Sequence, residues 1–369
     1  MTVHAELDPS LVTGAWREGD PTGHRRFTDI GDIALESGVV LPDVRIAYET
    51  WGRFDGGNAV LVLHALTADS HVTGAAGDGH PSPGWWGDLV GPGRAIDTDR
   101  FYVVAANILG GCQGTTGPAS RDPDGFPWGG SFPALTVRDQ VRAEVAFADE
   151  LGVPCWHGVI GGSAGGMRAL EWAIGHPDRV ERLFLLATSA AASAEQIALS
   201  STQIDAIRGD SAYFGGDFYD GPAGPVQGLD LARRIAHISY RSEGELATRF
   251  GRDVQDDGRF AVESYLQHHG AKLVNRFDAN SYIVLSAAMN SHDVGRGRGG
   301  VTSALARITA DTVVAGIDSD RLYPLHQQQE LADGIAGARS LEVVKSPYGH
   351  DGFLIESEQV GALARQLLS

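Results

Sequence analysis

A serine between glycines is the first feature of the sequence that can carry chemistry. Gly161, Ser163 and Gly165 stand in the pattern G-x-S-x-G, between an apolar run and a helical pattern. A tight strand–turn–helix connection with this pattern presents its serine as a nucleophile, and glycine avoids collisions two residues to either side. The alternative is a phosphate-binding loop, which needs a lysine or the spacing G-x-G-x-x-G. That spacing is missing and no lysine occurs between Ala143 and Ala271, so the sequence favours a nucleophile.

A serine nucleophile needs a base and an orienting carboxylate, and candidates for both occur late in the chain. The hydroxyl reacts well only when a histidine takes its proton and a carboxylate holds that histidine in place. His350 occurs in SPYGHDGFL, and Asp318 and Asp320 occur in VVAGIDSDRLYP. Each segment follows a strand-like run, at the edge where parallel sheets place their reactive groups. The spacing alone does not separate Asp318 from Asp320.

Two backbone N–H groups are expected to stabilise the oxyanion that forms when such a serine attacks a carbonyl. One is the N–H of Ala164, directly after the nucleophile. The other is expected from the segment LHALTADS, where Leu66 is the best candidate. An ordinary strand-to-loop turn is the alternative interpretation of that segment.

Alternating strand and helix patterns must position these groups. Apolar or β-rich runs predict strands over residues 44–52, 58–66, 101–107, 155–160, 182–188, 311–317 and 341–346. Helical patterns cover residues 136–152, 165–174 and 357–368. This alternation predicts the α/β class, with a mostly parallel sheet flanked by helices.

The helix expected over residues 136–152 has clear end signals. Thr136 and Asp139 have the spacing of a capping box, and Gly152 is a stop signal. The side chains expected to line its buried face are Val137, Val141, Val145 and Ala148.

The character of the chain changes between residues 189 and 300. Helical spacing recurs over residues 193–209, 228–242, 261–277 and 278–294, with no comparable strand pattern. The glycine-rich GRGRGG then leads back to strand-like sequence. We therefore expect a core formed by residues 1–188 and 301–369, with an inserted helical lid over residues 189–300.

The overall charge excludes some classes of partner. Asp and Glu number 47 against 29 Lys and Arg, which gives a net charge of −18. Nucleic acids and anionic membranes need clustered cations, so neither is expected as a partner. The N-terminal stretch has no signal-peptide core, and no run reaches the roughly 18 apolar residues of a membrane span. With only two cysteines, these features predict a cytoplasmic protein.

A metal site is not expected from the histidines. His64, His71 and His80 lack the close spacing of ligand pairs, and the neighbouring His268 and His269 have no matching Cys or Asp pattern. The sequence therefore predicts no bound metal.

Longer blocks of the sequence resemble the homoserine O-acetyltransferase family of the α/β-hydrolase superfamily. The resemblance extends from about Tyr48 almost to the C-terminus. It rests on residues 84–118 (GWWGDLVGPGRAIDTDRFYVVAANILGGCQGTTGP) and on the blocks GGSAGGMRALEW, ARRIAHISYRS, VESYLQHHGAKLVNRFDANSY, DSDRLYP and GHDGF. The resemblance implies an α/β-hydrolase fold in which Ser163 is the nucleophile, Asp320 the orienting acid and His350 the base. The second aspartate of DSD matches the family pattern, which decides against Asp318.

The resemblance also implies two homoserine contacts, Arg233 and Asp351. Chemistry agrees, because a zwitterionic amino acid needs a cation for its carboxylate and an anion for its ammonium group. The alternatives are a helix-surface cation for Arg233, which adjoins Arg234, and a loop carboxylate or helix cap for Asp351. Tyr240 is seven residues after Arg233, on the same helix face, and is expected to line the same cavity.

The activity implied by the resemblance is acetyl transfer from acetyl-CoA to L-homoserine in methionine biosynthesis, through an acyl-enzyme in a ping-pong mechanism. Acetyl-CoA is a co-substrate, no cofactor is implied, and a homodimer through the helical insertion is expected. Two departures are Ala164, where many members have methionine, and HALTAD in place of the commoner HALTG. The Ala164 N–H is unaffected by its side chain, so the expected oxyanion role carries over.

Several rival functions remain open from the sequence. A related acyltransferase would use succinyl-CoA as donor, or serine or deacetylcephalosporin C as acceptor. An esterase has the same triad with a site open to water. A binding protein without catalysis is disfavoured, because all three triad positions are filled.

Overall fold

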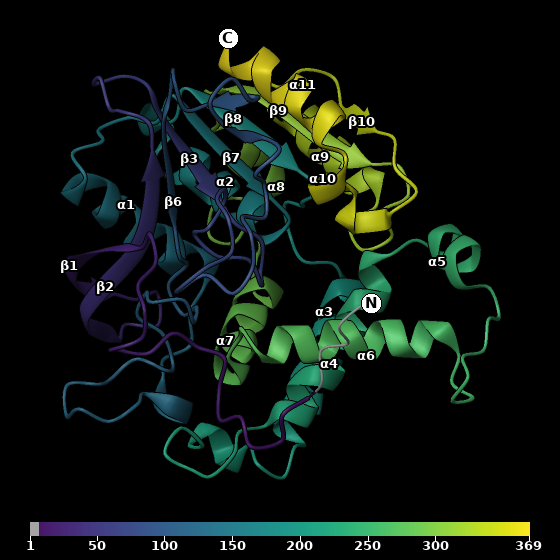
Figure 1. Ribbon diagram of the computed structural model, residues 1–369. Coiled ribbons are helices and arrows are strands. Elements are labelled where there is room, and N and C mark those ends of the chain that lie inside the picture. Colours follow the sequence, from purple (N-terminus) through teal and green to yellow (C-terminus); the bar gives the residue numbers. More distant parts are fainter. Residues whose placement is uncertain (1–6) are drawn as a thin grey trace.

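The computed structural model describes residues 7–369. An eight-stranded sheet forms the centre of the molecule (Figure 1). The strand order is β1-β2-β6-β3-β7-β8-β9-β10. The bounds are β1 (Arg26–Ala34), β2 (Val40–Trp51), β3 (Ala59–Leu63), β6 (Tyr102–Ala106), β7 (Gly158–Gly162), β8 (Arg182–Leu186), β9 (Asp311–Ile317) and β10 (Glu342–Val344). Strand β2 runs antiparallel to both of its neighbours. The other six strands, β6, β3, β7, β8, β9 and β10, pair in parallel with one another in that order. The predicted mostly parallel sheet is confirmed.

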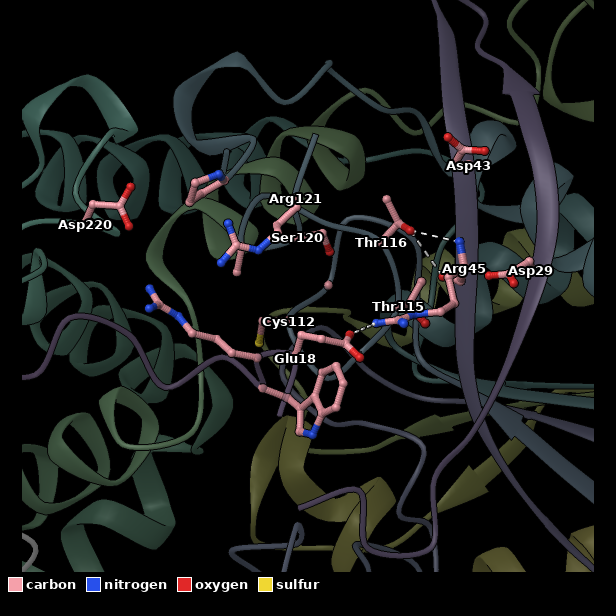
Figure 2. A pocket seen from close by; sticks show the side chains of 16 residues that line it. Glu18, Asp29, Asp43, Arg45, Cys112, Thr115, Thr116, Ser120, Arg121 and Asp220 are labelled. Atoms are coloured by element: carbon pink, nitrogen blue, oxygen red, sulfur yellow. Dashed lines mark hydrogen bonds and ion pairs between the residues drawn. The ribbon is translucent and has the colours of Figure 1, made fainter. Parts of the chain in front are cut away.

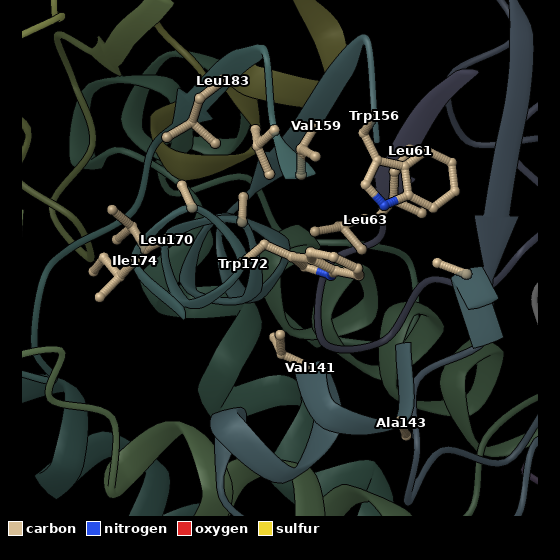
Figure 3. Close-up of a cluster of buried hydrophobic side chains, with 14 of the residues drawn as sticks. Leu61, Leu63, Val141, Ala143, Trp156, Val159, Leu170, Trp172, Ile174 and Leu183 are labelled. Carbon is tan, nitrogen blue, oxygen red and sulfur yellow. The ribbon is translucent and has the colours of Figure 1, made fainter. Parts of the chain in front are cut away.

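Helices cover both faces of this sheet. One face carries α1 (Val137–Glu150), α2 (Ala164–Gly175), α8 (Val301–Leu305) and α9 (Leu325–Gly334), and the other carries α10 (Gly352–Ile355) and α11 (Ser357–Leu368). Successive side chains of a strand point to opposite faces, so in β3 Leu61 packs toward α2 and Val60 toward α11. Figure 3 shows the first of these cores, where Trp172 lies beneath the strands. A strand covered on both faces needs a continuous apolar run, as β3 has.

The expected capping box of α1 is present. The Asp139 N–H donates to Thr136 Oγ1 at 3.2 Å, and the Thr136 N–H donates to Asp139 Oδ2 at 3.0 Å. The expected buried face is only partly right, because Val145 is half-buried whereas Glu144 and Phe147 are buried. Helix α1 packs against β1 as well as α2, which widens its buried face.

The described chain between β8 and β9 is helical. After β8 come α3 (Ala194–Arg208), α4 (Val226–Tyr240), α5 (Glu243–Phe250), α6 (Ala261–Val274) and α7 (Ala279–Asn290). Figure 1 shows α3, α4, α6 and α7 gathered beyond one end of the sheet. Their own apolar cluster includes Leu229, Leu273 and Tyr282, and Ile108 from the loop after β6 joins it.

The described residues comprise all but the first six of the chain and include both cysteines. Residues 1–6, which belong to the expected core segment and the N-terminal stretch, lie outside the described residues. Within residues 7–369 no helix is both long enough and apolar enough to cross a membrane. Cys112 and Cys155 are both free thiols.

Candidate active site

Ser163 lies at the sharp turn between β7 and α2. Its backbone φ of 56° and ψ of −125° are rarely adopted by residues with side chains. A Cβ at Gly161 would lie 2.2 Å from the Gly165 carbonyl oxygen, and one at Gly165 would lie 2.0 Å from the Leu63 carbonyl oxygen. Both positions therefore accept only glycine, and the motif is explained by the close packing of α2 against β7 and β3.

The structure brings Ser163, His350 and Asp320 together across the C-terminal ends of β7, β9 and β10. The Ser163 Oγ and His350 Nε2 atoms are 2.9 Å apart, and His350 Nδ1 lies 2.6 Å from Asp320 Oδ2. All three residues are buried. The Leu322 and Tyr323 N–H groups donate to Asp320 Oδ1 at 2.8 and 2.9 Å, which fixes the carboxylate.

Asp318 is directed elsewhere. Its Oδ1 accepts from the Ser346 N–H at 2.9 Å, and its Oδ2 lies 3.4 Å from Lys345 Nζ. Only Asp320 orients His350, in agreement with the choice that the family resemblance made.

Aromatic rings contact the His350 imidazole. The Tyr323 ring stacks on it at a centroid distance of 5.0 Å, and the Phe353 ring meets it edge-on at 5.2 Å. Burial raises the pKa of the Tyr323 phenol, which therefore stays neutral. Sequence reasoning missed Tyr323, although it lies in the DSDRLYP block.

Ser163 lines a cavity of about 160 Å³ whose walls contain most of the predicted site residues. Its lining includes Ser163, His350, Leu66, Arg233, Tyr240 and Asp351. Of the two predicted oxyanion donors, Leu66 lines the same cavity as Ser163, and Ala164 is the first residue of α2. A helix leaves its first N–H groups without intrahelical partners, so the Ala164 N–H is free of the α2 ladder.

Arg233 faces this cavity from α4. Its Nη1 donates to Thr67 Oγ1 at 3.4 Å, and its guanidinium carbon lies 5.2 Å from the centre of the Tyr240 ring. Its buried Nε has no hydrogen-bond partner among the described residues. The neighbouring Arg234 forms an ion pair with Asp230 instead. Of the two arginines, Arg233 is therefore the one available to a ligand.

Asp351 differs from the expected free counter-charge, because it already has a cationic partner. Its Oδ2 lies 3.1 Å from Arg241 Nε. Burial raises the pKa of Asp351, while Arg241 and Arg233 act against that rise. A second arginine that the sequence analysis missed, Arg276, also lines the cavity and donates to the Thr67 carbonyl oxygen at 2.5 Å. The cavity therefore carries more positive charge than predicted.

Comparisons with known proteins place this geometry in a family. Residues 58–357 match the family model described as alpha/beta hydrolase fold. The chain is 60% identical to the homoserine O-acetyltransferase of Thermobifida fusca over 99% of each chain. It is 58% identical to the homoserine O-acetyltransferase of Clavibacter michiganensis subsp. michiganensis, over 96% of this chain and 95% of the relative. The chain belongs to the homoserine O-acetyltransferase family.

Solved structures similar to this homoserine O-acetyltransferase family member include both transferases and hydrolases. A homoserine O-acetyltransferase from Bacillus anthracis matches with a TM-score of 0.85 and 26% identity, over 94% of this chain and 97% of that one. The structure of esterase E22 matches with the same TM-score and identity, over 94% and 99%. The backbone alone therefore does not separate transfer from hydrolysis.

A larger cavity of about 510 Å³ lies elsewhere on this family member (Figure 2). It shares no lining residue with the Ser163 cavity. Its Arg45 is paired with Glu18 at 2.8 Å, and none of the triad residues reaches it. The smaller cavity is therefore the candidate active site.

Two of the histidines lie close together in the fold although they are distant in the sequence. The sequence predicted no metal site because His64, His71 and His80 lack the close spacing of ligand pairs, and in the structure the rings of His71 and His80 stack at 3.9 Å. With Glu49 they offer three possible ligand atoms within 4.8 Å of one another. Loop folding brings these residues together, which their spacing in the sequence does not indicate.

Proposed function

We propose that this protein transfers an acetyl group from acetyl-CoA to the side-chain hydroxyl of L-homoserine, with Ser163 as the covalent carrier. The observation that carries the proposal is the Ser163–His350–Asp320 hydrogen-bond chain, which opens into a cavity shared with Arg233 and Asp351. High identity to relatives named homoserine O-acetyltransferase supports the same substrates.

In the first half-reaction His350 Nε2 accepts the Ser163 proton, and Ser163 Oγ attacks the thioester carbonyl carbon. The Leu66 and Ala164 N–H groups stabilise the oxyanion, and Asp320 stabilises the imidazolium. The C–S bond then breaks, His350 returns the proton to sulfur, and CoA leaves. Ser163 now holds the acetyl ester.

In the second half-reaction homoserine takes the place of CoA. Arg233 holds its carboxylate and Asp351 its ammonium group, which brings the side-chain hydroxyl near His350. His350 removes the hydroxyl proton, the new oxygen attacks the Ser163 ester, and O-acetylhomoserine leaves as the proton returns to Ser163. These steps use protein groups alone, so we propose no metal or prosthetic group. In the proposed role this reaction is a step of methionine biosynthesis.

Transfer outruns hydrolysis only when the acceptor is held in attack geometry and water is scarce. Effective molarities of roughly 10⁵ M or more are available to well-oriented groups. We propose that residues 189–300 act as the lid that excludes water, because α4 supplies Arg233 and Tyr240 to the cavity wall.

A mass measurement of the intact protein tests this function. Incubation with acetyl-CoA should leave one acetyl group on Ser163, and the Ser163→Ala variant should carry none. Homoserine should then remove the adduct and yield O-acetylhomoserine. A parallel incubation with succinyl-CoA, and a panel of hydroxy amino acids including serine, tests the alternative donors and acceptors.

An esterase is the second candidate, favoured by the equal structural similarity to esterase E22. The rate of CoA release with and without homoserine separates the two functions. A rate that rises strongly with homoserine supports transfer. Equal release without any acceptor means hydrolysis and rules out the transferase proposal.

We also propose a homodimer formed through the helical insertion. Leu231 and Ile238 of α4 are large apolar side chains, and they are 47% and 44% exposed. Their spacing of seven residues places them on one face of the helix. A second copy of this chain is the partner that we propose for that face.

A further inference from the structure

A buried ion pair lies behind the loop that carries one of the proposed oxyanion donors. We call residues 64–71 the oxyanion loop, because Leu66 lies within it. Glu49 of β2 is 1% exposed and accepts from two residues at the end of this loop. Its Oε1 accepts from Ser70 Oγ at 2.8 Å, and its Oε2 accepts from His71 Nδ1 at 3.0 Å.

The contacts of His71 require a charged imidazole. Its second ring nitrogen, Nε2, lies 3.2 Å from the Ala75 carbonyl oxygen, so both nitrogens face acceptors. A neutral imidazole has one N–H, and only the cation donates from both nitrogens. Burial opposes this charge, but the hydrogen bond and charge of Glu49 outweigh it and raise the pKa of His71. Glu49 and His71 therefore form a buried carboxylate–imidazolium pair.

His80 completes the cluster as a neutral ring. Its Nε2 accepts the His24 N–H at 3.0 Å, and its Nδ1 has no partner among the described residues. Burial lowers the pKa of His80 to about 4. The His71 and His80 rings are nearly parallel, at 14°, so their in-plane lone pairs do not converge on one point. This geometry, together with the hydrogen bonds of Glu49 and His71 described above, favours a hydrogen bond between Glu49 and His71 at this cluster rather than a bound metal ion.

The oxyanion loop is anchored at both ends. At its start, the His64 carbonyl oxygen accepts from Arg168 Nη2 at 2.6 Å, and His64 Nε2 accepts from the Ile108 N–H at 3.1 Å. At its end, the Ser70 N–H donates to Asn107 Oδ1 at 2.8 Å, in addition to the Glu49 contacts.

Between these anchors lie the groups that face the reaction. Leu66 and Thr67 line the cavity, and Thr67 accepts from both Arg233 and Arg276. A shift at the end of the loop therefore moves the Leu66 N–H, and with it Thr67, the residue to which both arginines donate.

We propose that Glu49 is a positioning residue for the reaction: paired with His71 and bound to Ser70, it sets the place of the Leu66 N–H relative to Ser163. The inference rests on the proposed function for its mechanism, and it assigns Glu49 no contact with substrate. Arg168 of α2 holds the start of the same loop to the helix that follows Ser163. Arg168 therefore positions one end of the loop, and Glu49 positions the other.

The test compares Glu49→Gln with the wild-type protein in two measurements. The first is the rate of Ser163 acylation by p-nitrophenyl acetate, an activated ester that needs neither CoA nor homoserine. The second is the Kd of methylboronic acid, which adds to Ser163 Oγ and forms a tetrahedral adduct with an oxygen at the oxyanion donors. We expect acylation to slow and the Kd to rise by similar factors of about 10 or more, below the roughly 10²–10³-fold loss when a donor is removed. The KM for the ester should change little.

Glu171→Gln is the matched control. Glu171 is also buried, and it accepts from Arg138 and Arg298 without contacting the oxyanion loop. This variant should lose thermal stability but keep the acylation rate and the boronate affinity. If Glu49→Gln behaves like Glu171→Gln in both measurements, the proposal is wrong.

Two further measurements keep the proposal testable. Ser70→Ala removes one of the two Glu49 contacts, and if Glu49→Gln does not fold, unchanged acylation in Ser70→Ala overturns the proposal. Stoichiometric Zn²⁺ binding that depends on Glu49 and speeds acylation would instead identify a metal site and also overturn it. Because the ester assay bypasses CoA and homoserine, failure of the transferase proposal is recognised separately, by the absence of acetyl transfer.

Discussion

The two aspartates of DSD show how the function of a residue depends on its immediate contacts. We predict that Asp320→Asn lowers kcat by about 10³–10⁴-fold, because an amide no longer holds His350 in the required tautomer or stabilises its cation. Asp318→Asn should stay within a few-fold of wild type, since Asp318 contacts Ser346 and Lys345. Steady-state kinetics of both variants checks this, and equal losses would contradict the assignment.

Asp351 should give homoserine binding a characteristic pH dependence. The pKa of its carboxyl group is raised from the ordinary value of 3.8, mainly by burial. As the pH falls, Asp351 therefore gains a proton earlier than an exposed aspartate does and loses its attraction for the ammonium group. We predict that KM for homoserine rises as the solution is acidified, while KM for acetyl-CoA does not share this rise.

Asp351→Asn is the control for that pH dependence. The variant should have a high KM for homoserine that is nearly independent of pH, and it should still form the acyl-enzyme. A variant KM that keeps the wild-type pH dependence would show that another group binds the ammonium.

The sequence predicted the residues whose types are tied to local patterns. Ser163 was recognisable because its motif spans five residues that form one turn. Arg276 and Tyr323 were missed, because their positions depend on contacts with residues far away in the chain. Arg276 reaches Thr67 across 209 positions, and no short pattern records such a contact.

At the scale of elements, the close approach of α2 to β3 limits what the elbow can contain. We predict that Gly165→Ala destabilises the protein by about 3 kcal/mol or more, because its Cβ would lie 2.0 Å from the Leu63 carbonyl oxygen. Gly175, at the end of the same helix, has nothing within 4 Å of an added Cβ. Gly175→Ala should be neutral or stabilise by up to about 1 kcal/mol. Chemical denaturation of both variants measures the difference, and equal effects would show that the close approach relaxes easily.

Two of the elements that the sequence missed, β1 and α9, have weak patterns for physical reasons. Strand β1 lies at the sheet edge, is largely polar, and has register shifts around Gly31 that break its alternation. Helix α9 has a polar sequence, LHQQQELADG, with only Leu331 as a deeply buried apolar residue. Strands such as β3, whose two faces are both covered, were recognisable from apolar residues alone.

At the scale of the whole molecule, the candidate site joins parts of the chain that fold around different cores. Ser163 and His350 belong to the sheet and its loops, whereas Arg233 and Tyr240 belong to α4, one of the helices between β8 and β9. These helices are not separate from the sheet, because Ile108, from the loop after β6, packs into their apolar cluster. In the proposed mechanism the sheet therefore supplies bond making and breaking, and the insertion supplies recognition of the acceptor and exclusion of water.

The proposed homodimer is the prediction that depends on the outer surface of the insertion. Burying Leu231 and Ile238 against a second copy removes apolar area from water, at about 25 cal/mol per Å². We predict that the double variant Leu231→Asp, Ile238→Asp is monomeric where the wild type is dimeric, because desolvating an unpaired carboxylate is costly. Light scattering coupled to size-exclusion chromatography measures the mass.

Phe126→Asp is the matched control, since Phe126 is 66% exposed on a loop outside residues 189–300, and it should leave the dimer intact. A monomeric wild type would show that no dimer forms. A dimer that survives both aspartates would show that the contact lies elsewhere.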